Sequence, residues 1–269
     1  MRFLKIILIV LLVAVGALYL FTEARDLASG ADVPPVIQCD SDLLEISVSQ
    51  GEEALLAGVH ASDQQDGDLT DKILLRGLSK LVSNDTAKVS YIVFDSDGNA
   101  ATVSRMVRYT DYEKPHFTLE KALIYTENQD IRLLDRLTAR DTIDGDITDA
   151  IRVSAMSATD DPEIQTVSVQ VTNSMGDTAQ LQLPIVTYSG VVVRPTIELS
   201  DYLVYVAEGN SFDPYRYVIG IDTPIGAGDV DRLQVTSQVD TTVPGTYYVY
   251  YRYPYSITVA VSILTVVVE

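Results

Sequence analysis

Residues 61–73 read Ala-Ser-Asp-Gln-Gln-Asp-Gly-Asp-Leu-Thr-Asp-Lys-Ile, and residues 139–151 read Ala-Arg-Asp-Thr-Ile-Asp-Gly-Asp-Ile-Thr-Asp-Ala-Ile. The two stretches share the pattern Ala-x-Asp-x-x-Asp-Gly-Asp-(Leu/Ile)-Thr-Asp-x-Ile at an offset of 78 residues, which is too long a match to arise from composition. A degraded third copy at residues 222–230 keeps an aspartate at each end. Self-similarity at a fixed period indicates an array of like modules.

The repeat extends well beyond the acidic motif. Each copy opens on a proline, at Pro35, Pro115 and Pro195, with 80 residues from one to the next. Units of this length are large enough to have cores of their own, unlike the short repeats of solenoids. The sequence therefore predicts three domains, at residues 35–112, 113–190 and 191–269.

Within each unit the apolar residues alternate with polar ones over short runs. Val89, Tyr91 and Val93 alternate, an Asp-Ser-Asp-Gly-Asn turn follows, and a second alternating run continues to Val107. Turn residues between two alternating runs are typical of a β-hairpin. About seven such strands in 80 residues predict an all-β chain of three tandem Ig-like β-sandwiches. The linkers between them are short, so we expect a semi-rigid rod of domains.

The N-terminus predicts a membrane helix. Residues 6–21 carry no charge, Arg2 and Lys5 precede them, and Glu23 and Asp26 follow. This length matches the apolar core of a bilayer, and the charge asymmetry places the remainder of the chain outside. We expect a single-pass signal-anchor at residues 1–24 in the cell membrane, then a linker at residues 25–34 and extracellular domains. A cleaved signal peptide is the alternative.

Composition excludes several classes of protein. Asp and Glu number 38 against 19 Lys and Arg, a net charge of -19, which argues against a nucleic-acid partner. The single cysteine excludes an intramolecular disulfide framework and a cysteine-based zinc site, and two histidines argue against a histidine-based centre. No serine-hydrolase, zinc-protease or phosphate-loop motif occurs. We therefore expect no enzyme activity.

The acidic motif followed by a hairpin with Asp-Gly-Asn-Ala resembles bacterial Ig-like domains of the hyalin-repeat and pesticidal-crystal-protein type. The resemblance covers residues 35–269 and is strongest in the first two copies. It implies seven-stranded sandwiches strung along surface proteins, adhesins and extracellular enzymes, as accessory modules without catalysis of their own.

The acidic loops are the first candidate site. Carboxylates that cluster on a turn offer the hard oxygen ligands that Ca²⁺ takes, although the spacing is not that of an EF-hand. The competing interpretation is a polar turn, in which aspartates accept backbone hydrogen bonds and glycine takes a positive φ. Calcium is the one cofactor these loops suggest, through the carboxylates of Asp63, Asp66, Asp68, Asp141, Asp144 and Asp146.

Tyrosine marks the second candidate site. Ten of the 16 tyrosines lie in the third copy. On the strand at residues 247–253, alternation places Tyr248, Tyr250 and Arg252 together on the outward face. Exposed aromatic rings beside an arginine suit a glycan or a protein partner, whereas β-propensity alone also favours tyrosine on a strand.

Together these features predict a non-enzymatic, exported, membrane-anchored cell-surface protein, whose Ig-like domains form a stalk for adhesion or protein–protein interaction. The alternative is a calcium-dependent or carbohydrate-binding surface module. The expected partners are the membrane, through the N-terminal helix, and an unidentified surface protein or glycan.

Overall fold

The computed structural model describes residues 2–29, 33–190 and 192–269. Its first element is helix α1 (Arg2–Ser29), which includes an 18-residue stretch, Ile7–Ala24, with a mean hydropathy of 2.4 and no burial against the rest of the chain. By length and composition this helix can cross a membrane or serve as a signal sequence. It runs five residues past the expected end at residue 24, because residues 25–29 contain no glycine or proline to stop it. Part of the expected linker, residues 30–32, lies outside the described residues.

The chain divides into two compact units, residues 1–112 and residues 113–269. The first unit holds domain 1, whose two sheets have the strand orders β1-β3-β4 and β2-β7-β6-β5. A short helix, α2 (Glu52–Leu55), precedes β3, and a 3₁₀ turn, η1 (Thr70–Lys72), follows β4. The strands of domain 1 are β1 (Val36–Cys39), β2 (Leu43–Ile46), β3 (Val59–Asp63), β4 (Gly67–Asp68), β5 (Leu74–Leu78), β6 (Thr86–Phe94) and β7 (Ala100–Tyr109).

Domain 2 repeats this plan, with the orders β11-β10-β8 and β12-β13-β14-β9. The short helix before its third strand is η2 (Leu133–Asp135), and the turn after its fourth is η3 (Thr148–Ala150). The strands of domain 2 are β8 (His116–Leu119), β9 (Ile124–Thr126), β10 (Leu137–Asp141), β11 (Gly145–Asp146), β12 (Arg152–Ala158), β13 (Ile164–Thr172) and β14 (Thr178–Tyr188).

Domain 3 has the same plan again, with the orders β15-β17-β18 and β16-β21-β20-β19. Its short helices are η4 (Pro214–Tyr217) and η5 (Val230–Arg232). The strands of domain 3 are β15 (Thr196–Leu199), β16 (Leu203–Val206), β17 (Val218–Thr223), β18 (Gly226–Ala227), β19 (Gln234–Ser237), β20 (Gly245–Tyr255) and β21 (Thr258–Val268).

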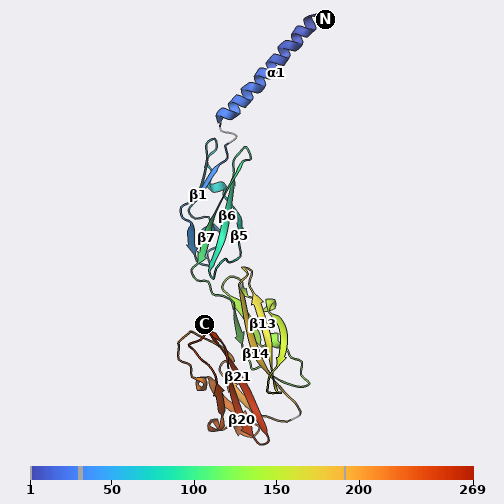
Figure 1. The fold of residues 1–269 in the computed structure, drawn as a ribbon, viewed down its shortest axis with the longest axis vertical. Coiled ribbons are helices and arrows are strands. Elements are labelled where there is room, and N and C mark those ends of the chain that lie inside the picture. Colours follow the sequence, from blue (N-terminus) through green and yellow to red (C-terminus); the bar gives the residue numbers. More distant parts are fainter. Residues whose placement is uncertain (1, 30–32, 191) are drawn as a thin grey trace. The chain divides into compact units, whose positions relative to one another are not determined.

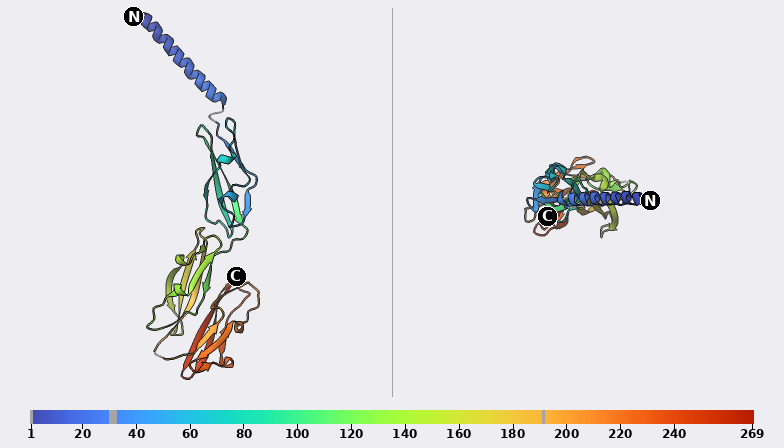
Figure 2. Two further views of the ribbon diagram at one scale, coloured as in Figure 1. Left: turned by 180° about the vertical axis from the view of Figure 1, so that it is seen from behind. Right: turned by 90° about the horizontal axis from the view of Figure 1, so that it is seen from above.

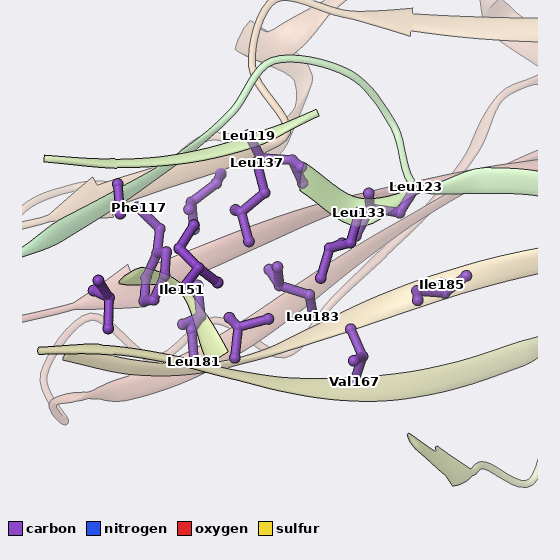
Figure 3. Packing of buried hydrophobic residues seen from close by; sticks show 14 of the residues in the cluster. Phe117, Leu119, Leu123, Leu133, Leu137, Ile151, Val167, Leu181, Leu183 and Ile185 are labelled. Carbon is purple, nitrogen blue, oxygen red and sulfur yellow. The ribbon is translucent and has the colours of Figure 1, made fainter. Parts of the chain in front are cut away.

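The prediction of three tandem β-sandwiches behind an apolar helix is confirmed (Figure 1). In each domain the second strand pairs in parallel with the last, and the other pairs are antiparallel. The alternating residues of each hairpin point inward, so the two sheets bury their apolar faces against each other. In domain 2 the core includes Phe117, Leu137, Ile151, Val167 and Leu183, from both layers (Figure 3).

Domains 2 and 3 lie side by side within the unit 113–269 (Figures 1 and 2). Strand β14 of domain 2 contacts strand β21 of domain 3, and strand β8 contacts β16. This differs from the end-to-end succession that short linkers led us to expect for a rod. The outer faces of the two sheets are apolar where they meet, at Ile164 and Val186 of domain 2 and Val261 and Ile263 of domain 3.

Candidate functional site

The acidic loop of domain 1 is held by its own carboxylates. The Asp63 carboxylate accepts hydrogen bonds from the backbone N–H groups of Gln65 and Asp66, at 2.7 and 2.9 Å. These donors, with that of Asp66 the stronger, lower the pKa of Asp63 because they stabilise its charged form. Gly67 follows with φ +74°, a conformation that a side chain would strain. The loop between β3 and β4 is therefore a tight polar turn.

Asp66 connects this loop to the turn of the β6–β7 hairpin. Its two carboxylate oxygens accept from the backbone N–H and the hydroxyl of Ser96, at 2.6 and 2.8 Å. Ser96 lies in the turn of the β6–β7 hairpin, 30 residues along the chain. Asp66 thus ties the β3–β4 turn of one sheet to the hairpin of the other, with both oxygens engaged.

Asp68 starts the 3₁₀ turn η1. Its carboxylate accepts from the backbone N–H of Thr70 at 2.9 Å, and the side-chain hydroxyl of Thr70 accepts from the N–H of Ala61 at 3.2 Å. The turn places the side chains of Leu69 and Ile73 in the core, where Leu69 is 1% exposed. Each repeated position of the motif therefore has a structural role in closing this end of the sandwich.

Domain 2 repeats most of this pattern. The Asp141 carboxylate accepts from the N–H of Asp144 at 2.6 Å. Asp144 accepts from the N–H and hydroxyl of Ser174 at 2.6 and 2.7 Å, again 30 residues away. Asp146 accepts from the N–H of Thr148 at 3.0 Å. The repeated sequence motif is thus a repeated hydrogen-bond pattern.

Calcium binding by these loops stays a prediction. Among residues 2–29, 33–190 and 192–269, no group of three or more His, Cys, Asp or Glu side chains is arranged to hold a metal ion. The motif carboxylates already accept short backbone and serine hydrogen bonds, which use part of their acceptor capacity. One oxygen, Oδ2 of Asp141, is buried without a hydrogen-bond partner. The geometry is that of the polar turn that the sequence offered as the competing interpretation.

Domain 3 lacks the tie between loop and hairpin. The residue before the first glycine of β18 is Ile225, where the other domains have Asp66 and Asp144. Ile225 is 88% exposed, and Ile257, in the β20–β21 turn, is 92% exposed. The remaining aspartate, Asp229, accepts from the N–H of Asp231 and caps η5. The degraded motif therefore lacks the carboxylate that joins the loop to the hairpin in domains 1 and 2, and it keeps the aspartate that caps the 3₁₀ turn.

The tyrosine face of domain 3 lies against domain 2. We use this name for Tyr248, Tyr250 and Arg252, which are all partly buried. The Tyr248 hydroxyl donates to the backbone carbonyl of Gln182 at 3.0 Å. The Arg252 guanidinium lies 5.0 Å from the centre of the Tyr250 ring and 3.6 Å from the Asp161 carboxylate. The three side chains predicted for an outside partner thus contact a neighbouring domain, and their binding of an outside partner stays a prediction.

Four aliphatic side chains form the centre of this interface. Ile164 and Val186 of domain 2 are buried with Val261 and Ile263 of domain 3, and Tyr248 and Tyr250 pack around them. The Tyr188 hydroxyl accepts from the N–H of Val261 at 2.7 Å, and burial raises the pKa of Tyr188.

Polar contacts complete both ends of the interface. At one end the Arg194 guanidinium lies 4.0 Å from the centre of the Tyr188 ring and 3.0 Å from the Glu163 carboxylate. At the other end the Tyr205 hydroxyl accepts from the N–H of Phe117 at 3.0 Å, and burial raises the pKa of Tyr205 to about 12. Apolar contacts flanked by hydrogen bonds are the anatomy of a stable interface.

Sequence reasoning missed the residues at the centre of the interface. A signal was present, since residues 258–268 are apolar on both faces of the strand, with Val261 and Ile263 outward and Ala260, Leu264 and Val266 inward. A strand that is apolar on both faces is buried on both faces.

The comparisons with known proteins leave the function open. No family model matches the chain, and no curated protein sequence matches it. A solved structure of CBM51-2 in complex with GlcNAc and INT domains, from Clostridium perfringens ZmpB, is 17% identical with a TM-score of 0.24, and the match covers 51% of this chain and 29% of that one. The extracellular domain of protocadherin GammaB4 is 12% identical, with a TM-score of 0.23 and coverages of 89% and 50%.

A lipoprotein from Bacteroides thetaiotaomicron is also 12% identical, with a TM-score of 0.21 and coverages of 86% and 98%. The chain spans 29% to 41% of the length of the Clostridium structures that it matches. Likeness this low carries no argument about activity. The function must be argued from the residues of this chain.

Acid is expected to destabilise domains 1 and 2 through the motif carboxylates. Hydrogen bonds from the side chain and backbone of Thr148 lower the pKa of Asp146, and Thr70 does the same for Asp68. A lowered folded-state pKa gives stability that is complete above the unfolded value of 3.8 and is lost as pH falls through the folded value. Melting temperatures measured from about pH 6 to pH 2 should therefore fall at the acid end.

The matched variants are Asp146→Asn and Asp149→Asn. Asparagine at position 146 keeps an acceptor for Thr148 but cannot titrate, so part of the acid-induced fall should disappear. Asp149, in the first turn of η3, serves as the control. An equal effect of the two substitutions on the pH profile would contradict the role of the hydrogen bond that Asp146 accepts from Thr148.

Proposed function

We propose that this protein is a non-enzymatic, exported cell-surface protein, which helix α1 anchors in the membrane and whose Ig-like domains stand outside as a stalk for adhesion or protein–protein interaction. The support at the N-terminus is the uncharged stretch between Lys5 and Glu23, with basic residues before it and acidic residues after it. The proposal includes membership of the bacterial Ig-like domains that the repeated motif resembles.

One observation carries this proposal. Both clusters of reactive side chains that the sequence singles out have structural partners: the aspartates bind their own turns and hairpins, and the tyrosine face binds domain 2. Side chains engaged in this way hold a scaffold together. A protein whose polar clusters serve its architecture is suited to positioning a surface at a distance from the membrane.

The acidity of the exported domains fits this role. A net charge of -19 keeps such a chain soluble, and it repels anionic surfaces before they come into contact with the protein. It favours partners that dock through specific contacts over non-specific attachment to phosphate-rich polymers.

The second candidate is a calcium-dependent or carbohydrate-binding surface module. The observation that favours it is the Oδ2 atom of Asp141, which is buried without a hydrogen-bond donor. A buried carboxylate oxygen without a donor needs a partner, and a bound cation would supply one. A rise in melting temperature with millimolar Ca²⁺ that EDTA reverses would support this candidate, because a ligand that binds only the folded state stabilises it.

The proposal is tested by the topology and attachment of cells that produce the full chain with a C-terminal epitope tag. We expect the tag to be removed by protease added to intact cells, and the N-terminal helix to remain in the washed membrane fraction. In the control, replacing residues 1–29 by a cleavable signal peptide should release the domains into the medium. A tag that stays protected, or wild-type protein found free in the medium, would contradict the anchored topology.

The adhesive role needs its own comparison. Cells that display the full chain should attach to one another or to a partner cell more than cells that display residues 1–112 alone. Equal attachment, with equal surface amounts of both proteins, would overturn a role for domains 2 and 3 in adhesion.

A further inference from the structure

Domain 2 contains an apolar pocket. Its volume is about 500 Å³, within the range of small-molecule sites. It opens between η2 and the edge strand β12 and reaches the core at β13 and β14. Figure 3 shows Leu133, Val167 and Ile185 around its inner end. The other apolar walls are Ile131, Leu134, Val153 and Met156.

A bulge in β12 shapes this pocket. The register of β12 against β13 shifts between Val153 and Met156. In a regular strand, positions 153 and 156 would face opposite sides of the sheet, whereas both line the pocket here. The same bulge interrupts the free edge of β12, which disfavours the addition of a further strand. The pocket therefore suits a compact group and not an extended chain.

In domain 3 the segment around η4 carries aromatic rings. Phe212, two residues before η4, stands where domain 2 has Ile131, and its ring stacks on that of Tyr217, the last residue of η4, with ring centres 5.7 Å apart. Phe212, Tyr217 and Val235 of the edge strand β19 pack against the core of domain 3. Val235 is the register counterpart of Val153, since Val235 pairs with Tyr251 and Val153 pairs with Val169. Domain 2 has no aromatic side chain in the lining of its pocket.

A tyrosine also ties the short helix to the sheet in the sister domains. The Tyr91 hydroxyl donates to the carbonyl of Leu55 at 2.5 Å in domain 1, and the Tyr251 hydroxyl donates to that of Pro214 at 2.6 Å in domain 3. Register pairing makes Val169 the counterpart of both. In domain 2 this valine makes no such bond, and Tyr125 of β9 donates instead to the carbonyl of Arg132, the residue before η2, at 3.3 Å.

We propose that this pocket is a binding site for a small aromatic molecule with a polar substituent. The aromatic ring lies against Leu134 and Met156, beside Ile131, where domain 3 has the ring of Phe212. Arg132 and Asp135, which also line the pocket, offer one cation and one anion to the substituent. This inference goes beyond the surface role proposed above and does not depend on it.

The test uses N-phenyl-1-naphthylamine, a neutral aromatic probe that fluoresces when it leaves water. Residues 113–269 form a compact unit with cores of their own, so this fragment is titrated directly. We expect saturable binding at one site per molecule and a raised melting temperature in circular dichroism. Fluorescence that rises without saturation would overturn the proposal.

Variants locate the bound probe. The double variant Leu134→Asn/Met156→Gln changes two half-exposed side chains and should weaken binding about tenfold or more, the usual cost of polar groups in a small apolar site. The control, Ile225→Asn/Ile257→Asn, removes two more exposed aliphatic side chains outside the pocket and should leave binding unchanged. An equal loss in both variants would overturn the site.

A variant that fills the pocket with a side chain separates a loss of binding from a loss of folding. Val153→Tyr adds a ring of the protein's own to the exposed edge strand, so it should abolish probe binding while keeping or raising the melting temperature. Unchanged probe affinity in a folded Val153→Tyr fragment would also overturn the proposal.

Discussion

Replacing Arg105 by alanine is expected to lower the free energy of unfolding of domain 1 by about 3 kcal/mol or more. Arg105 is 4% exposed, and its guanidinium donates to the carbonyls of Leu55 and Ala57 at 3.1 and 2.5 Å and to the Tyr91 hydroxyl at 3.0 Å. Alanine leaves a cavity and removes the donors of buried acceptors, which are two of the costly changes in a core. The arginine holds α2 onto the sheet, so we expect α2 to detach first.

The measurement is urea or thermal unfolding of the exported portion, residues 33–269. A loss of this size in a domain of about 80 residues corresponds to a fall of roughly 12 to 24 °C in its melting temperature. The matched control is Arg108→Ala, which removes an exposed arginine of the same strand that pairs with Glu45 at 3.0 Å. Exposed pairs contribute about 1 kcal/mol or less. Equal losses in the two variants would contradict the buried role of Arg105.

The second large effect is expected at the interface between domains 2 and 3. Ile263, 7% exposed, is buried there with Val261, Ile164 and Val186. Ile263→Asp would place a carboxylate in this apolar cluster at a cost of several kcal/mol. The two domains avoid that cost by separating, because apart from Leu203, which is buried in the cluster of domain 2, each core is built from its own sandwich. We therefore expect an open unit with intact sandwiches.

Small-angle scattering of residues 113–269 measures this change. The radius of gyration should increase in the Ile263→Asp variant, and thermal unfolding should resolve into separate transitions for the two domains. Ile257→Asp makes the same chemical change in a fully exposed turn of the same hairpin and should alter neither quantity. An unchanged radius of gyration in the Ile263→Asp variant would contradict the interface.

The repeated motif and the alternating runs were sufficient to predict the sandwiches. Alternation such as that of Val89, Tyr91 and Val93 specifies which side chains face inward, and all three are buried. The polar turn was also within reach of the sequence, since aspartate and glycine at these positions have known turn geometry. The partner of Asp66 was not, because a bond to Ser96 depends on how two sheets close over each other.

Other features left signals that were passed over. Arg105 stands in the inward series of β7 with Val103 and Val107, where an arginine indicates a buried polar network. The interface was harder to predict, since periodicity tells which residues face outward and not what covers them. The outward position of Tyr248 and Tyr250 was predicted. The surface that covers them belongs to domain 2, and no local sequence pattern tells that domains 2 and 3 pack against each other.

The account rests most of all on the interface between domains 2 and 3, because that contact makes two sandwiches one unit. The most direct measurement is a nuclear Overhauser spectrum of residues 113–269, read for a cross-peak between the Tyr188 ring protons and the Val261 amide proton. The Tyr188 hydroxyl lies 2.7 Å from the Val261 nitrogen, so we expect a clear cross-peak that the Ile263→Asp variant loses. A wild-type spectrum with both residues assigned and no cross-peak between them would contradict the account.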